Sequence, residues 1–138
     1  MDFTINFSAI NVLVVFAATL AANILGGLWY SPLLFGKLWR SISNLPHLSA
    51  PGGAPVGAFV SGFILQLIAA SLLAALLGPN AGGSDGLQFG LLVGFAFVFT
   101  ALGITNLFEH RSIGLILINS GYHTAALGLM GFIIGNWS

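Results

Sequence analysis

The fold is decided by IGLILINSGYHTAALGLMGFIIGNW, residues 113–137. A helix needs about 20 mostly apolar residues to cross the roughly 30 Å hydrocarbon core of a bilayer. This stretch is long enough, and it contains no charged side chain. The sequence therefore predicts a transmembrane helix here.

The composition of the whole chain agrees with that prediction. Of the 138 residues, 57 % are apolar and 4 % are charged, and the mean hydropathy is +1.02. A soluble domain carries about 25 % charged residues, so this chain has too little charge to cover a surface in water. Disordered segments are polar and charged, which excludes disorder. The absence of cysteine excludes disulfides and cysteine nucleophiles.

Three further apolar stretches qualify as spans, so the set is 7–29, 56–77, 87–108 and 113–137. The predicted fold is all-α: one polytopic membrane domain over residues 1–138 with four transmembrane helices. We expect the first span to be a retained transmembrane helix rather than a signal peptide, because Asp2 stands where a positive start is expected and the apolar core is too long. Pro55 suits a first helical turn, Gly78-Pro79 a helix end, and Ser112 a helix cap.

A short interfacial helix is expected after the first span, at residues 33–42. It would place Lys37 and Arg40 one turn apart and turn Phe35 and Trp39 toward lipid. The residues that follow it, with their prolines and glycines, suit an irregular linker.

The cations predict an orientation. Lys37 and Arg40 lie in loop 31–54 and Arg111 lies in loop 109–112, whereas the other side has Asp2, Asp85 and no cation. By the positive-inside rule both loops are cytoplasmic and both termini are outside.

Glycines mark one face of the fourth span. Gly114, Gly121, Gly128 and Gly135 recur every seven residues and so drift by only about 20° per step around a helix. Small residues let helix backbones approach closely in lipid. This stripe predicts helix packing, with a partner either in the same subunit or in the next.

Polar side chains gather in the predicted cytoplasmic half of the spans: Asn23, Gln66, Asn106, Glu109, Asn119, Tyr122 and His123. Unpaired amides and imidazoles are costly in hydrocarbon, so these groups must face each other, water or a ligand. Two interpretations remain open. One is a cleft for a ligand or ion that opens to the cytoplasm; the other is an interhelical hydrogen-bond network that fixes packing.

His123 would lie near the middle of the bilayer, where an imidazole can either relay protons or serve as a neutral hydrogen-bond partner. Glu109, His110 and Arg111 form a turn that suits a salt-bridged anchor or a gate at the mouth of the cleft. The histidines show no metal-ligand spacing, so no metal and no other cofactor is expected.

Two groups of motifs resemble a known family. GGLWYSPLLFGKLW occupies residues 26–39, and TNLFEHRS, INSGYH and MGFIIGNW follow between residues 105 and 137. They are similar to the small four-helix bacterial membrane proteins of the domain of unknown function 1761 family. The resemblance implies a multi-pass protein of the inner membrane, and it brings no established activity that could be carried over to this chain. It draws attention to Trp29, Tyr30, Ser31 and Pro32 beside the polar residues above, with Lys37 and Arg111 as further interface candidates.

The sequence leaves three alternative hypotheses about the function. The first is a homo-oligomeric transporter or channel for a small solute or ion. The second is a structural or accessory membrane protein that docks a partner protein or lipid. The third, an intramembrane enzyme, is disfavoured because no nucleophile–base pair has a recognisable spacing. Nucleic acid is not an expected partner, since there is no basic run.

Overall fold

The protein is described here by a computed structural model that covers residues 4–43 and 56–137. Within these ranges all regular secondary structure is helical, which confirms the all-α prediction. Four helical stretches are long and apolar enough to cross a membrane: Val12–Trp29, Val56–Leu77, Gly83–Phe108 and Ile113–Trp137. The predicted four-span architecture is therefore confirmed.

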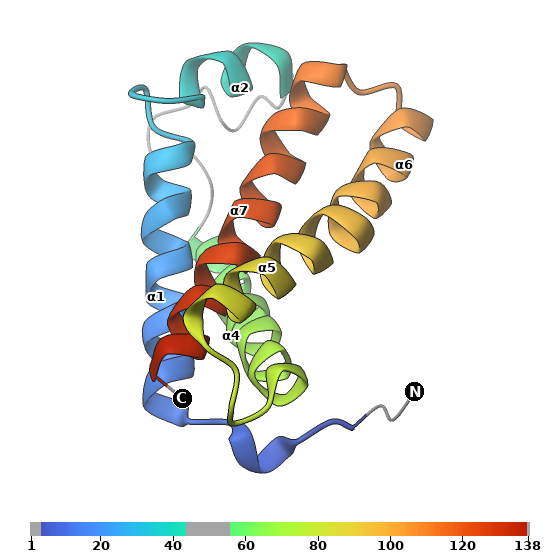
Figure 1. Ribbon diagram of the computed structural model, residues 1–138. Helices are drawn as coiled ribbons and strands as arrows, with labels where there is room; N and C mark the ends of the chain where they lie inside the picture. Colours follow the sequence, from blue (N-terminus) through green and yellow to red (C-terminus); the bar gives the residue numbers. More distant parts are fainter. Residues whose placement is uncertain (1–3, 44–55, 138) are drawn as a thin grey trace.

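The elements follow one another as η1 (Phe7–Ala9), α1 (Val12–Trp29), α2 (Gly36–Ser43), α4 (Val56–Leu77), α5 (Gly83–Val93), η2 (Gly94–Phe99), α6 (Thr100–Phe108) and α7 (Ile113–Trp137). The third span is thus α5, η2 and α6 in succession, and η2 is a π-helical turn. In Figure 1, α2 lies across the end of the bundle where α1 finishes and α7 begins. We call this the α2 end; the turn between α4 and α5 lies at the opposite end.

Two predicted spans begin at different residues in the structure. The first helix begins at Val12 rather than residue 7, because the Asn11 side chain accepts hydrogen bonds from the N–H groups of Leu13 (3.1 Å) and Val14 (3.4 Å). The third begins at Gly83 rather than residue 87. Its first turn packs on α7, and this packing outweighs the low helix propensity of glycine.

The other boundaries follow the predicted signals. α4 ends at Leu77, and Gly78 takes a positive φ of 77° that favours glycine. Ser112 caps α7, since its hydroxyl accepts from the N–H of Leu115 at 3.1 Å. The short helix after α1 is present but begins at Gly36 and ends at Ser43, so the predicted range of 33–42 was shifted.

Several predictions fall outside the described residues. These concern Asp2 as an outside marker, Pro55 as a first-turn residue and the linker from residue 44 onward.

The fourth span is the central helix. Half of the residues in its most apolar 18-residue window are buried, against 11 % for the third span. Its buried residues Tyr122, Ala126, Met130 and Ile134 form one core cluster. The same cluster includes Val15, Ala18 and Ala22 of α1 with Ala70, Leu73 and Ala74 of α4. The core is therefore built from α1, α4 and α7.

The third span joins this core through glycines. A Cβ atom at Gly86 would collide with the backbone carbonyl of Gly131, and one at Gly90 would collide with that of Leu127. A Cβ at Gly94 would lie 2.7 Å from Cα of Thr124. Only glycine allows this approach, so α5 and α7 are in backbone contact.

The glycine stripe of α7 meets several elements of its own chain. Gly128 lies under Leu91, and Gly135 lies against the Gly82 backbone. Closer to the α2 end, a Cβ at Gly121 would lie 3.3 Å from the Trp29 ring, and one at Gly114 would lie 3.3 Å from Ile42. These partners come from α5, from the turn before it, from α1 and from α2.

Candidate functional site

The chain reverses direction at the α2 end through the residues that follow α1. The Ser31 hydroxyl donates to the Leu28 carbonyl at 2.7 Å and accepts from the N–H of Leu33 at 3.3 Å, around the exposed Pro32. A Cβ at Gly36 would collide with the Tyr30 carbonyl, so this position requires glycine. The tight reversal brings α2 back over the bundle.

Aromatic side chains of this reversal pack on α7 and on one another. The indole N–H of Trp29 donates to the Ile118 carbonyl at 3.0 Å, and its ring centroid lies 5.0 Å from that of Phe35. Tyr30 lies between Trp39 and Tyr122, with centroid distances of 5.0 and 5.6 Å. The sequence motif thus forms an aromatic cluster that ties α1 and α2 to α7.

Tyr30 makes the first polar link in the cluster. Its hydroxyl donates to Oδ1 of Asn119 at 2.8 Å. Burial raises the pKa of the Tyr30 phenol, and the nearby phenol of Tyr122 raises it further. The phenol therefore stays protonated at neutral pH and acts as a hydrogen-bond donor.

Tyr122 makes the second link, deeper in the bundle. Its side chain is 9 % exposed, and its hydroxyl donates to the Ala22 carbonyl at 2.7 Å. The same hydroxyl accepts from Nε2 of Gln66 at 3.0 Å. Gly26 leaves room for the phenol, since a Cβ there would lie 3.0 Å from the hydroxyl oxygen. One phenol thus connects α1, α4 and α7.

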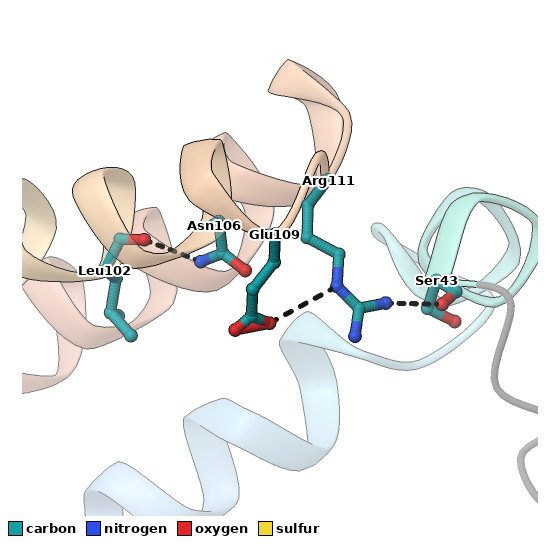
Figure 2. Close-up of polar contacts among 5 residues, drawn as sticks. All are labelled: Ser43, Leu102, Asn106, Glu109 and Arg111. Atoms are coloured by element: carbon teal, nitrogen blue, oxygen red, sulfur yellow. Dashed lines mark hydrogen bonds and ion pairs between the residues drawn. The ribbon is translucent and has the colours of Figure 1, made fainter.

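Two predicted site residues lie apart from this network. Nδ2 of Asn23, an exposed residue, donates to the Thr19 carbonyl at 2.8 Å. Nδ2 of Asn106 donates to the Leu102 carbonyl at 2.7 Å (Figure 2). Each amide bonds back to its own helix, so neither joins two helices through these bonds.

The turn between α6 and α7 carries the charged groups of the predicted mouth. Nε of Arg111 lies 3.7 Å from Oε1 of Glu109, and Nη1 of Arg111 donates to the Ser43 carbonyl at 3.1 Å (Figure 2). Both side chains are partly exposed, so the ion pair contributes little to stability. The geometry is that of an anchor between this turn and the end of α2, where Lys37 remains exposed.

His110 gives this turn its shape. The N–H groups of His110 and Arg111 donate to the carbonyls of Leu107 (3.1 Å) and Asn106 (2.9 Å), which is the Schellman pattern at a helix end. His110 has φ of 59°, where glycine is usual. This turn therefore stores backbone strain that a glycine would not.

His123 is the exception among the residues near the middle of α7. It is half-buried, and its ring lies at the edge of Tyr122 with a centroid distance of 5.1 Å. No hydrogen bond joins its imidazole to the described residues. Its environment therefore differs from that of Asn119 and Tyr122, whose side-chain oxygens have partners.

An open pocket in the described part of the chain lies at the opposite end. It has a volume of about 490 Å³ and is lined by Leu76, Leu77, Pro79, Asn80, Ala81, Asp85 and Phe89. None of the site residues predicted from the sequence lines it. Among the described residues there is also no group of three His, Asp or Glu side chains placed to hold a metal ion.

Sequence reasoning missed several partners in this region. The acceptors for Trp29, Tyr122 and Arg111 are backbone carbonyls, which carry no sequence signal. It also missed the burial of Ser120, whose hydroxyl has no partner among the described residues. A serine in a membrane helix does not by itself indicate whether its hydroxyl is buried or has a partner.

Comparisons with known proteins give one positive result. No curated protein and no solved structure matches the chain. A family model described as "Protein of unknown function (DUF1761)" matches residues 13–135, nearly the whole length. The chain is therefore a multi-span membrane protein that belongs to the DUF1761 family.

Proposed function

We propose that this protein is a structural or accessory membrane protein whose α2 end binds the headgroups of anionic lipids. The first support is that polar groups of the predicted cleft are used within the protein. Tyr30 bonds to Asn119, and Tyr122 bonds to Gln66 and to the Ala22 carbonyl. Such bonds serve packing between helices.

The observation that carries the proposal is the distribution of charge and apolar surface on α2 and the turn before it. Lys37 and Arg40 are exposed on the same short helix, close to exposed Leu33, Leu34 and Leu38. A helix with cations beside apolar side chains suits the membrane–water interface. Arg111 is already engaged by Glu109 and Ser43, which leaves Lys37 and Arg40 for the ligand.

The orientation predicted by the positive-inside rule supports the same ligand. It places the α2 end at the cytoplasmic leaflet, where anionic lipids attract basic segments. At the opposite end the charged side chain among the described residues is Asp85, which would repel the same headgroups.

Fluorescence quenching of Trp29 and Trp39, the two tryptophans of the α2 end, tests the proposal. The full chain would be placed in vesicles containing acyl-brominated phosphatidylglycerol or brominated phosphatidylcholine, in a Trp137→Phe background. We expect stronger quenching by phosphatidylglycerol at equal mole fraction. Lys37→Gln with Arg40→Gln should lower that preference roughly tenfold or more, because each basic residue near an anionic surface contributes about 1 kcal/mol. Asp85→Asn is the matched control.

Equal quenching by the two lipids, or a preference that survives loss of both cations, would refute the proposal. A clear gain of preference in the Asp85→Asn control would also count against it, since that substitution raises the net charge by one and would show that net charge rather than the α2 end is responsible.

Transport of protons or a small solute by a homo-oligomer is a second candidate, favoured by His123. A half-buried imidazole near the middle of a span, without a hydrogen-bond partner among the described residues, suits a proton relay or ligand contact. Four helices alone rarely enclose a pore, so several copies would have to assemble.

Proteoliposomes with an internal pH-sensitive dye test this second candidate. A proton flux under an imposed gradient that His123→Phe abolishes would support it. Asn23→Ala, which removes an amide bonded to its own helix, should leave the flux unchanged. Absence of flux of protons and small cations from vesicles with verified protein insertion would reject it.

A further inference from the structure

The two halves of the third span are held very differently. α5 contacts α7 backbone to backbone at Gly86 and Gly90, and the contact at Gly94 extends it to the first residue of η2. α6 has no buried residue, and in Figure 1 it diverges from α7 as it runs toward the α2 end of the bundle. The first half is therefore fixed against the core, whereas the second half is not closely packed and can move.

The change from one half to the other occurs in the π-helical turn Gly94–Phe99. A π turn holds one residue more than an α turn, and such turns occur frequently at functional sites. Conversion of this turn to α-helix would rotate every later residue of the span by about 100°. Gly94 is fixed by Thr124, so the rotation would be carried by α6.

A buried hydroxyl on α7 lies opposite this turn. Ser120 is 0 % exposed, and its Oγ has no hydrogen-bond partner among the described residues. Other helical hydroxyls, such as those of Thr19 and Ser71, donate to the carbonyl four residues earlier in their own helix. Ser120 does not use that option, so its hydroxyl is available to another group.

The contacts on either side of Ser120 define what it faces. One turn later, Thr124 meets Gly94; one turn earlier, Ile116 lies 3.9 Å from the position of a Cβ at Gly103. Ser120 therefore faces the third span between these two glycines. That stretch contains the rest of the π turn and the start of α6.

The far end of α6 is held by weak links. Its turn contains the strained His110 and the partly exposed pair of Glu109 and Arg111, with one hydrogen bond from Arg111 to Ser43 on α2. These links can be broken and remade at small cost.

We propose that Gly94–Phe99 is a two-state hinge. In the state described here the turn is π-helical and the Ser120 hydroxyl is unpaired. In the second state the turn is α-helical, α6 is rotated against α7, and Ser120 donates to a backbone carbonyl of the third span. This proposal is independent of lipid binding and of transport.

Distances between spin labels test the hinge in the full chain in lipid nanodiscs. The chain has no cysteine, so label pairs can be introduced directly. Ile104→Cys with Leu117→Cys reports on α6 against α7, and both residues are exposed. Leu92→Cys with Phe132→Cys reports on the locked half and serves as the control pair.

We expect two distances for the first pair that differ by up to about 8 Å, because a 100° rotation moves a side-chain tip about 5.5 Å from the helix axis by that amount. We expect one distance for the control pair. Deletion of Ala96 should leave only the first distance, because it removes the extra residue of the π turn and makes the turn α-helical while α6 keeps the orientation that it has in the state described here. Ser120→Ala should remove the second distance, and Ser71→Ala, whose hydroxyl stays within α4, should not.

A single distance for the first pair in the parent chain would overturn the proposal. Two distances that the Ala96 deletion leaves in place would overturn it too. If the deletion variant fails to insert, the comparison of Ser120→Ala with Ser71→Ala still decides. The role given to Ser120 would be contradicted if Ser120→Ala, like Ser71→Ala, left the populations of the two distances unchanged.

Discussion

The Tyr30 hydroxyl donates a 2.8 Å hydrogen bond to Oδ1 of Asn119 and so joins residues 89 positions apart in the chain. Both residues belong to motifs that the sequence marks as unusual for a membrane helix. In the structure they bind each other, which assigns them first to the packing of the α2 end. The following predictions test this network and the contacts around it.

Tyr30→Phe should lower the free energy of unfolding in detergent. The lost interhelical bond is worth about 0.6 kcal/mol and at most about 1.7 kcal/mol in membrane proteins. A double-mutant cycle with Asn119→Ala should return a coupling of that size. Asn23→Ala is the control for loss of an amide, and a coupling of zero between Tyr30 and Asn119 would contradict the bond.

Tyr122→Phe should cost more than Tyr30→Phe. Its hydroxyl both donates to Ala22 and accepts from Gln66, so its removal also leaves the Gln66 amide without this partner. We expect a loss of about 1–3 kcal/mol, measured by equilibrium unfolding in mixed micelles. Thr100→Val removes a hydroxyl bonded only within its own helix and should be nearly neutral.

Gly86→Ala should separate α5 from α7. The added methyl would meet the Gly131 carbonyl, which is backbone and cannot swing aside. Overpacking of this kind costs about 1–3 kcal/mol, and thermal unfolding should begin at a lower temperature. Gly27→Ala provides the matched control, since a Cβ there meets nothing within 4 Å; equal effects of the two changes would refute the backbone contact.

His110→Gly should leave stability unchanged or raise it by up to about 1 kcal/mol, because glycine adopts positive φ without strain. The reverse change at the other turn, Gly78→Ala, should destabilise the protein, since its φ of 77° disfavours a side chain. Melting temperatures of both variants in the same detergent give the comparison. A large loss of stability in His110→Gly would show that the imidazole makes contacts of its own.

The span pattern could be predicted from the sequence because hydrophobicity and helix signals act locally. Ser112 caps α7 and Gly78 ends α4, as their residue types predict. The first span was predicted to begin too early, since the apolar run starts before Asn11 whereas the helix begins only after the cap at that residue. The third span was predicted to begin only at residue 87, after its first glycines, because their contact with α7 is what makes them helical.

The partners of the polar residues could not be predicted in the same way. The sequence gathered Tyr122, Asn119 and Gln66 in the same half of the spans, yet it left open whether they face a ligand or one another. The choice depends on how the helices are rotated and how the chain reverses at Gly36. Two acceptors, the carbonyls of Ala22 and Ile118, have no side-chain signal at all.

The sequence by itself determined that this protein lies in a membrane, crosses it with four helices and gathers its polar groups toward one end. These properties follow from hydrocarbon excluding charge and unpaired backbone groups, which acts on each segment separately. Only the tertiary structure decided that α7 is the central helix, that Tyr30 binds Asn119, and that the third span is locked at α5 and unburied at α6. Those outcomes depend on which backbones can approach, and that is decided by glycines and side chains from distant parts of the chain.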